Sequence, residues 1–191
     1  MSQQNVNTSA QSTQESSSEM PGSNVHFFSQ LHVRDAHGNF VMASAAQVLA
    51  EAMRAIDVRY PTGTIFESSE VSGEFFRAKL AGRDREVFAV AFLNNQNQLI
   101  AYEEIFAGSV NSVEVHPREI VRAAMRLNAA AVILSHNHPS FTPKPSKADN
   151  TITVRIKDAL QLVEVRLLDH IIVAGNETTS LAQLGHINNR G

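Results

Sequence analysis

Two unbroken apolar runs, residues 87–93 and 131–134, constrain the fold of this 191-residue chain more than any other feature. A strand with one face in water alternates apolar and polar side chains, so an unbroken apolar run predicts a strand covered on both faces. Between the two runs, residues 117–127 carry apolar side chains at helical spacing and begin with proline, which favours the first turn of a helix. Together these segments predict an α/β fold, with a sheet flanked by helices.

The rest of the chain divides into a polar N-terminal tail, an N-terminal extension and a main domain with further strands and helices. Ser, Gln, Asn and Thr dominate residues 1–24, and such a segment buries too little apolar surface to offset its ordering entropy, so we predict a disordered tail. Residues 25–67 form a predicted N-terminal extension, and the remaining residues, 68–191, form the main domain. The further predicted elements are a strand at 25–33, a turn at 35–39 with Phe40–Val41 pairing back, helices from Ser44 and from Ser69, a return strand at 98–106, a strand near 112–115, a helix from Ser146 and a last strand at 167–173.

Composition excludes several classes of protein. The chain has no cysteine, which removes disulfides, thiolate metal sites and cysteine nucleophiles. No apolar run approaches the roughly 20 residues that cross a bilayer, and the N-terminus has no apolar segment typical of a secretory signal. We therefore expect a cytoplasmic protein without membrane contact. The net charge of −3 gives no sign of the concentrated basic surface that nucleic-acid binding needs, although a local basic patch stays open.

Chemistry concentrates in the polar, proline-rich segment 135–149, which follows the second apolar run. His136 and His138 are two residues apart, and in extended backbone such side chains point to the same side. Asp149 falls in the first turn of the next predicted helix, and the loop between is long enough to bring its carboxylate to the two imidazoles. Three such ligands are typical of catalytic zinc sites, which leave the fourth position to a water whose pKa the metal lowers to about 7.

Simpler interpretations exist for each part of this pattern. A His-x-His pair is a weak signal by itself, because histidines are common in loops. The spacing of Ser146 and Asp149 is also typical of a helix-capping box, in which the serine and the acid bond each other's backbone N–H groups. The two roles are compatible, since a cap would hold Asp149 where a metal ligand must lie.

Several motifs in order resemble one known family. His136-x-His138, seven residues and then Ser146-x-x-Asp149 reproduce the JAMM motif. The stretches His136-Asn-His-Pro-Ser140, Asp169-His-Ile-Ile172, Glu103-Glu-Ile-Phe-Ala-Gly108 and Val115-His-Pro-Arg-Glu119 resemble the RadC family in more detail. The likeness covers about residues 68–186 and leaves out a helix-hairpin-helix region, so the chain resembles a short, stand-alone RadC-like protein.

The resemblance implies a JAB1/MPN-like fold, whose layout is similar to that of cytidine deaminases, with a mixed sheet flanked by helices. It also implies Zn²⁺ held by His136, His138 and Asp149. A glutamate from an earlier strand would be the general base, and Ser146 would support the water or the oxyanion. Glu86 occupies the family's Arg-Glu-x-Phe position, so we prefer it over Glu103 and Glu104, although from the residues alone Glu86 fits a solvated carboxylate better. Since Glu86 opens one strand and His136 closes another, these strands should be antiparallel.

Two further features concern the surroundings of the site. Phe141 stands where the family has glycine after His-Pro-Ser, and glycine adopts backbone conformations that phenylalanine resists. The loop is therefore either reshaped or given a more apolar rim. Asp169 and His170 interrupt an apolar strand, and buried polar groups need partners. Support of the metal ligands and hydrogen bonding in the core are equally open roles for this pair.

The resemblance implies zinc-dependent hydrolysis of a peptide or isopeptide amide bond by an activated water, with an unknown peptide or protein as substrate. The alternative is a DNA-repair-associated accessory module whose zinc is structural or vestigial, and the acidic balance counts against it. A cytidine deaminase is disfavoured, because those enzymes combine Cys ligands with a His and this chain has no cysteine.

Overall fold

The computed structural model describes residues 31–108 and 115–187. Contacts divide the chain into two compact units, residues 1–43 and 44–191. The predicted tail at 1–24, the first part of the strand at 25–33 and most of the strand near 112–115 lie outside the described residues. Within the described ranges, no helix is both long enough and apolar enough to span a membrane.

The described part of the first unit is a small antiparallel hairpin of β1 (His32–Arg34) and β2 (Phe40–Met42). Asp35 shapes the turn, because its carboxylate accepts hydrogen bonds from the backbone N–H groups of His37 and Asn39. The turn and the return of Phe40–Val41 onto the first strand are thus as predicted.

The second unit contains the five-stranded sheet and all the helices of the described residues. Its elements, in chain order, are α1 (Ala45–Arg59), α2 (Ser69–Leu80), β3 (Val87–Leu93), β4 (Leu99–Ala107), α3 (Pro117–Arg126), β5 (Ala131–Asn137), α4 (Lys147–Gln161), β6 (Arg166–Ala174) and β7 (Glu177–Ser180).

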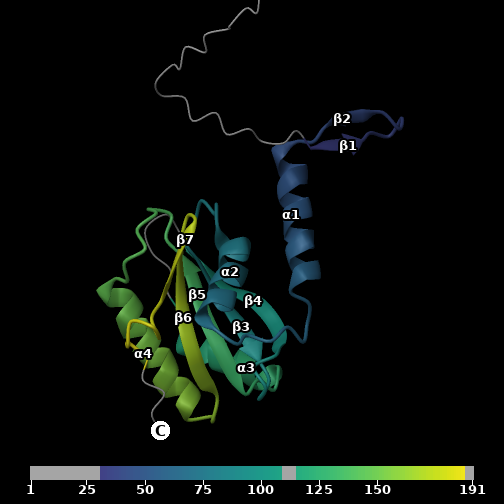
Figure 1. Ribbon diagram of the computed structural model, residues 1–191. Coiled ribbons are helices and arrows are strands. Elements are labelled where there is room, and N and C mark those ends of the chain that lie inside the picture. The colour runs from purple at the N-terminus through teal and green to yellow at the C-terminus, as the bar shows by residue number, and fades with distance from the viewer. Residues whose placement is uncertain (1–30, 109–114, 188–191) are drawn as a thin grey trace, which may run out of the picture. The chain divides into compact units, whose positions relative to one another are not determined.

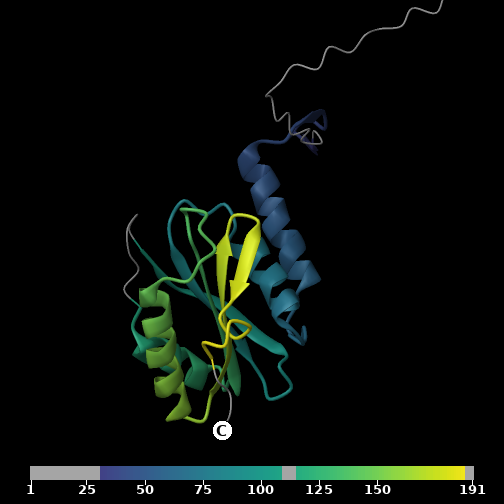
Figure 2. The ribbon, with the colours of Figure 1, turned by 60° about the vertical axis from the view of Figure 1, so that its left-hand side comes forward.

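Five strands form one mixed sheet in the order β4-β3-β5-β6-β7. β3 pairs antiparallel with both β4 and β5, β5 and β6 are parallel, and β7 closes the sheet as an antiparallel edge strand. Helix α4 makes the crossover between the two parallel strands, which need such a connection. In Figures 1 and 2, α3 and α4 cover one face of the sheet and α2 covers the other. The predicted mixed sheet flanked by helices is confirmed.

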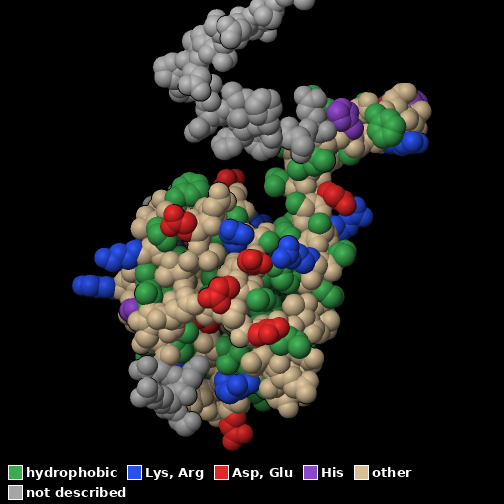
Figure 3. Space-filling view, in the orientation of Figure 1, with side chains coloured by type: hydrophobic (Ala, Val, Ile, Leu, Met, Phe, Trp, Pro, Cys, Tyr) green, Lys and Arg blue, Asp and Glu red, His purple; other side chains and the backbone are tan. Residues whose placement is uncertain are grey.

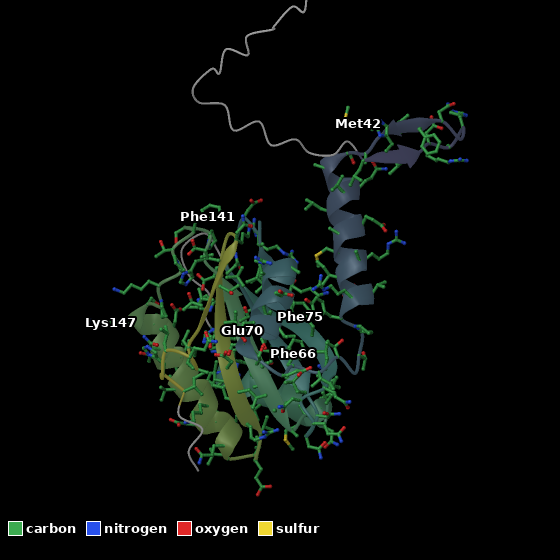
Figure 4. All side chains as sticks on the ribbon, viewed as in Figure 1. Met42, Phe66, Glu70, Phe75, Phe141 and Lys147 are labelled. Atoms are coloured by element: carbon green, nitrogen blue, oxygen red, sulfur yellow. The ribbon has the colours of Figure 1, made fainter. Side chains whose placement is uncertain are left out.

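Two apolar clusters, one on each face, explain why β3 is apolar throughout. Phe88, Val90 and Phe92 pack with α3 and α4, whereas Val87, Ala89, Ala91 and Leu93 pack with α2. All seven residues of this strand are buried. The α2 cluster also contains aromatic side chains, and Figure 4 labels two of them, Phe66 and Phe75, whose rings meet edge to face at 5.2 Å.

The helices begin at the capping residues that the sequence offers, with one correction. Ser44 and Ser146 each accept a hydrogen bond from the third residue of the following helix, and both form the reciprocal capping box. The cap of α2 is Ser68 and not Ser69 as predicted. The hydroxyl of Ser69 instead donates to the buried carboxylate of Asp169, at 3.0 Å.

Two strands differ from the sequence prediction. β5 continues past Leu134 through Asn137, so His136 lies within the strand and not in the loop beyond it. Ser135 and His136 stay extended there because β3 and β6 pair with them from both sides. In addition, 167–173 is not the last strand, because β7 follows it. The polar sequence of β7 lacks an apolar pattern, and its strand forms by pairing along β6.

Charges are mixed on the face of the second unit that Figure 3 shows. Lys and Arg side chains lie among Asp and Glu side chains there and do not gather in one area.

Candidate metal centre

The candidate site lies where β5 ends and α4 begins. His136 is the sixth residue of β5, and His138 follows the strand, with its backbone N–H donating to the carbonyl of Val173 at 2.8 Å. This bond continues the pairing with β6 one residue past the strand, so both imidazoles project toward α4, as the i, i+2 spacing predicts. The loop that follows leads to the first turn of α4, where the capping box fixes Asp149. Figure 4 marks this loop by Phe141 and, at its end, by Lys147.

Four atoms converge at this point. The Nε2 atoms of His136 and His138 are 2.9 Å apart. One carboxylate oxygen of Asp149 lies 3.2 Å from the His136 Nε2, and the other lies 3.5 Å from the His138 Nε2. Ligands that surround zinc tetrahedrally at 2.0–2.1 Å are separated by about 3.3 Å, which is close to these three spacings. The candidate ligands of the sequence analysis are thus brought together as one group.

The outer nitrogens of the two imidazoles show which ring atoms carry protons. His138 Nδ1 lies 2.7 Å from the backbone carbonyl of Thr142, which can only accept a hydrogen bond, so Nδ1 carries the proton. His136 Nδ1 lies 2.8 Å from Nε2 of His170. When each Nδ1 is the protonated nitrogen, both Nε2 lone pairs point at the carboxylate. Two imidazoles and a carboxylate that face one another in this way could hold a metal ion, and this donor set is of the kind that Zn²⁺ uses in proteins.

Electrostatics around the site agree with a place for positive charge. Hydrogen bonding to Asp149 raises the pKa of His138 above its ordinary value, against the opposing effect of burial, and the charge of Glu86 adds to the increase. Burial by itself would raise the pKa of Asp149. The contacts with His136 and His138 outweigh burial, so the pKa of Asp149 lies well below its usual range. Both shifts favour positive charge beside the carboxylate of Asp149.

Glu86 lies beside this group, as the antiparallel arrangement requires. Phe88 of β3 is the register partner of His136, and their rings stack with centroids 6.0 Å apart. Glu86 precedes Phe88 by two residues, so the same register continued past the strand brings it level with His138, on the same face of the sheet. The antiparallel pairing predicted for these two strands is confirmed.

Asn137, between the two histidines, holds the backbone on both sides of Glu86. Its side chain points to the opposite face, where Oδ1 accepts from the backbone N–H of Val87 at 2.8 Å and Nδ2 donates to the carbonyl of Arg85 at 2.9 Å. Asn137 is buried, so these bonds are shielded from water. Asn137 was not among the predicted site residues, and its place inside the His-x-His motif is the signal that could have indicated it.

The other two glutamates considered as a base lie farther from the group. Both are on β4, which is separated from β5 by β3. Glu103 accepts two hydrogen bonds from Arg126, at 2.6 and 2.8 Å, and Glu104 accepts one from Arg83 at 2.6 Å. Both of these glutamates are thus paired with arginine and lie one strand farther from the candidate ligands than β3 does.

Asp169 and His170 are adjacent in β6 and have different roles. Asp169 makes hydrogen bonds in the core, and His170 contacts the candidate ligand His136. The Asp169 carboxylate accepts from the hydroxyls of Ser69 and Ser180 and from the backbone N–H groups of His170 and Ala182, so it ties α2 and the end of β7 to the sheet. His170 turns to the opposite face and meets His136. Burial lowers the pKa of His170 well below its ordinary value, so this ring is neutral.

Phe141 adopts the backbone conformation that glycine favours, with φ of +58°. Its N–H donates to the carbonyl of His138 at 3.0 Å, which closes the turn, and 70% of its side chain is exposed. The ring lies against Gly175, where a Cβ atom would approach within 2.8 Å of the ring. Of the two expected consequences, the structure shows the apolar rim together with a glycine-like backbone.

Comparisons with known proteins point the same way. Residues 66–186 match the family model described as the RadC-like JAB domain. A UPF0758 protein of Vibrio cholerae is 49% identical over 139 residues, which are 73% of this chain and 87% of that protein. The UPF0758 proteins YfjY and YkfG of Escherichia coli K12 are 53% and 47% identical, over 65% and 73% of this chain and 78% and 89% of their own lengths.

Proposed function

This chain belongs to the family of RadC-like JAB domains, and from that premise we propose that it is a zinc-dependent hydrolase of amide bonds in peptide or isopeptide substrates. The observation that carries the proposal is the convergence of two imidazoles and one carboxylate, with the charge of a further carboxylate, Glu86, acting on His138. Three protein ligands are the number that catalytic zinc sites use. Zinc, when bound, supplies a Lewis acid that polarises the substrate carbonyl and makes water a better nucleophile.

The chain's own residues divide the remaining work. Glu86 accepts a proton from the attacking water and delivers it to the amine nitrogen as the carbon–nitrogen bond breaks. This role suits a carboxylate that is only partly buried and lies at the level of His138. Asn137 holds the backbone of the residues before and after Glu86, which limits the directions in which its side chain can point.

Ser146 has a hydrogen left to donate. Its Oγ accepts the backbone N–H of Asp149 at 3.1 Å, and a hydroxyl that accepts one bond still carries its own proton. We propose that this proton supports the oxyanion that forms when water adds to the carbonyl. Loss of such a donor typically costs about 2.7–4 kcal/mol of activation free energy. The cap and the catalytic role are compatible, because they use different parts of the same hydroxyl.

The test is a screen for cleavage by the zinc-loaded chain. Two libraries are needed, one of internally quenched peptides and one of isopeptides in which an amino acid acylates the side chain of lysine. We expect cleavage in at least one library that stops with EDTA and returns with zinc. Absence of cleavage in both, by protein shown to hold one zinc per chain, contradicts the proposed amide hydrolysis.

A matched pair of variants assigns the base. Glu86→Gln should keep its zinc and lose at least about 100-fold in rate, the lower bound of what a general base contributes. Glu103→Gln makes the same chemical change on β4 and should keep its rate. If Glu86→Gln cleaves as fast as the parent chain, Glu86 is not the base.

A further inference from the structure

A line of hydrogen bonds runs from His136 into the protein and ends on the backbone of another candidate ligand. His136 Nδ1 meets His170 Nε2 at 2.8 Å, and His170 Nδ1 meets the Thr153 hydroxyl at 2.6 Å. Thr153 in turn donates to the backbone carbonyl of Asp149 at 2.5 Å. The line therefore connects β5, β6 and α4, and it joins the ligand of the strand to the ligand of the helix.

The direction of every bond in this line follows from its far end. A carbonyl oxygen can only accept, so the single proton of the Thr153 hydroxyl goes to Asp149. Thr153 must then accept from His170, which places the proton of that ring on Nδ1. His170 is completely buried, with no carboxylate among the partners of its ring nitrogens, so a second proton on it would be a buried, unpaired charge. Its Nε2 is left as an acceptor.

The last bond sets the state of His136. Since His170 Nε2 accepts, His136 must donate from Nδ1, and its Nε2 keeps the lone pair that faces Asp149 and His138. His136 is itself buried, so water has little access to the ring and cannot readily stabilise its other tautomer. Metal-binding histidines ordinarily rely on a carboxylate, a carbonyl or water for this purpose. Here the acceptor is a second neutral imidazole, which works only if something fixes its own tautomer.

We propose that Thr153 and His170 are positioning residues that fix His136 in the metal-binding tautomer, and that Thr153 is the residue that gives the line its direction. This proposal rests on the proposed metal centre, but its first consequence is a property of the metal-free chain. His138 offers an internal reference, because its tautomer is set separately by the carbonyl of Thr142.

Two variants separate this role from ordinary helix packing. Thr153→Val replaces the hydroxyl by a methyl group of similar size, so His170 loses its acceptor while the shape of the site is kept. Thr151→Val is the matched control on the same helix, because Thr151 also donates to a carbonyl four residues back, at 2.9 Å, but is exposed and bonds to no histidine of the described residues. Thr153→Ser restores the hydroxyl.

The first measurement is nitrogen-15 NMR of the histidine rings in the metal-free chain, at a pH where the rings are neutral. We expect His136 and His170 to be Nδ1–H tautomers in the parent chain, in Thr151→Val and in Thr153→Ser. In Thr153→Val both should become mixtures of tautomers, while His138 stays unchanged. An unchanged His136 in Thr153→Val, or an Nε2–H tautomer in the parent chain, overturns the proposal.

The second measurement is zinc affinity by competition with a chromophoric chelator. Loss of a group that supports a metal ligand typically weakens binding by roughly 10–100-fold, and we expect that range for Thr153→Val, with Thr151→Val and Thr153→Ser close to the parent chain. Equal affinity in Thr153→Val and the parent chain contradicts the positioning role. If the parent chain binds no zinc, the metal centre fails, and the NMR result still decides the hydrogen-bond line.

Discussion

The two faces of the sheet carry different kinds of polar side chain where β5 and β6 run side by side. On the α4 face lie three imidazoles: His136 and His138, whose Nε2 atoms face Asp149, and His170, whose Nε2 meets Nδ1 of His136. On the α2 face lie Asn137 and Asp169, whose polar atoms bond to backbone groups and serine hydroxyls of the protein itself.

This difference follows from the alternation of side chains along a strand. Residues that are adjacent in the sequence, such as His136 and Asn137 or Asp169 and His170, therefore face opposite layers. We infer that the α4 face binds the metal and that the α2 face stabilises the fold. Substitutions on the α4 face should weaken metal binding and spare the fold, and substitutions on the α2 face should do the reverse.

The largest effect should come from removing a ligand. We expect His138→Ala to weaken zinc binding by more than about 100-fold, because residues that merely support ligands already contribute 10–100-fold. At a pH where His138 has lost its proton, the thermal unfolding of the metal-free variant should stay near that of the parent, since His138 is only partly buried. His37→Ala removes an imidazole from an exposed turn and is the control. Full zinc retention in His138→Ala would refute the ligand assignment.

Asp169→Ala should have the largest effect on the supporting face. It leaves two hydroxyls and two backbone N–H groups without their acceptor in a buried place. Each unsatisfied buried group costs about 1–3 kcal/mol, so we expect the free energy of unfolding to fall by roughly 3 kcal/mol or more in urea titrations. Asp158→Ala, on the exposed side of α4, should change little. Comparable loss in the two variants would contradict the supporting role of Asp169.

Asn137 tests whether the supporting face serves the site. Asn137→Ala removes the acceptor of the Val87 N–H, for an expected loss of about 1–3 kcal/mol in unfolding free energy. Zinc affinity should be unchanged, while any hydrolysis should fall because the backbone around Glu86 is released. Asn137→Asp keeps the acceptor and loses the donor to Arg85, so its losses of unfolding free energy and of hydrolysis should be smaller than those of Asn137→Ala. A large loss of zinc affinity in Asn137→Ala would contradict the assignment of Asn137 to a face that does not contribute to metal binding.

The pH dependence of the metal-free chain should reflect the α4 face. The pKa of His138 is raised by its bond to Asp149, so its contribution to stability is complete below its unfolded pKa of about 6.5 and is lost as pH rises through the higher folded value. We expect the melting temperature in EDTA to decline across that interval and the decline to vanish with saturating zinc, which replaces the proton. A decline of the same size in His138→Gln would assign it to other groups.

The smallest effect should come from Phe141. Positive φ at a residue other than glycine costs of order 1–3 kcal/mol, which Phe141→Gly would recover in part, while the ring contact with Gly175 and some backbone entropy are lost. We expect a net change within about 1 kcal/mol and unaltered zinc affinity. A large change in zinc affinity would show that the ring of Phe141 acts on the centre and not just on its rim.

Local pattern in the sequence was enough to predict the frame of the fold and the three candidate ligands. Two features of the sequence are short-range: the apolar run of β3 and the spacing of His136, His138, Ser146 and Asp149. Short-range features can be recognised without knowledge of the tertiary structure. Helix α4 could be placed because its cap and its proposed ligand share one motif.

What the sequence did not reveal depends on pairing between distant segments. His170 and Thr153 meet His136 only through the parallel register of β5 with β6 and the position of α4 above them. β7 forms because β6 offers an unpaired edge, and its own residues carry no strand pattern. Ser68 and Ser69 are equivalent as caps in the sequence, and the buried Asp169, 100 residues away, decides between them.

X-ray absorption spectroscopy at the zinc edge tests the central claim most directly, because it reports the atoms around the metal. For the chain loaded with one equivalent of zinc and freed of excess metal, we predict four nitrogen or oxygen neighbours at about 2.0–2.1 Å, two of them imidazoles. A spectrum with no imidazole signature, with three or more imidazoles, or with the six oxygen neighbours of a hydrated surface ion would contradict a centre built from His136, His138 and Asp149.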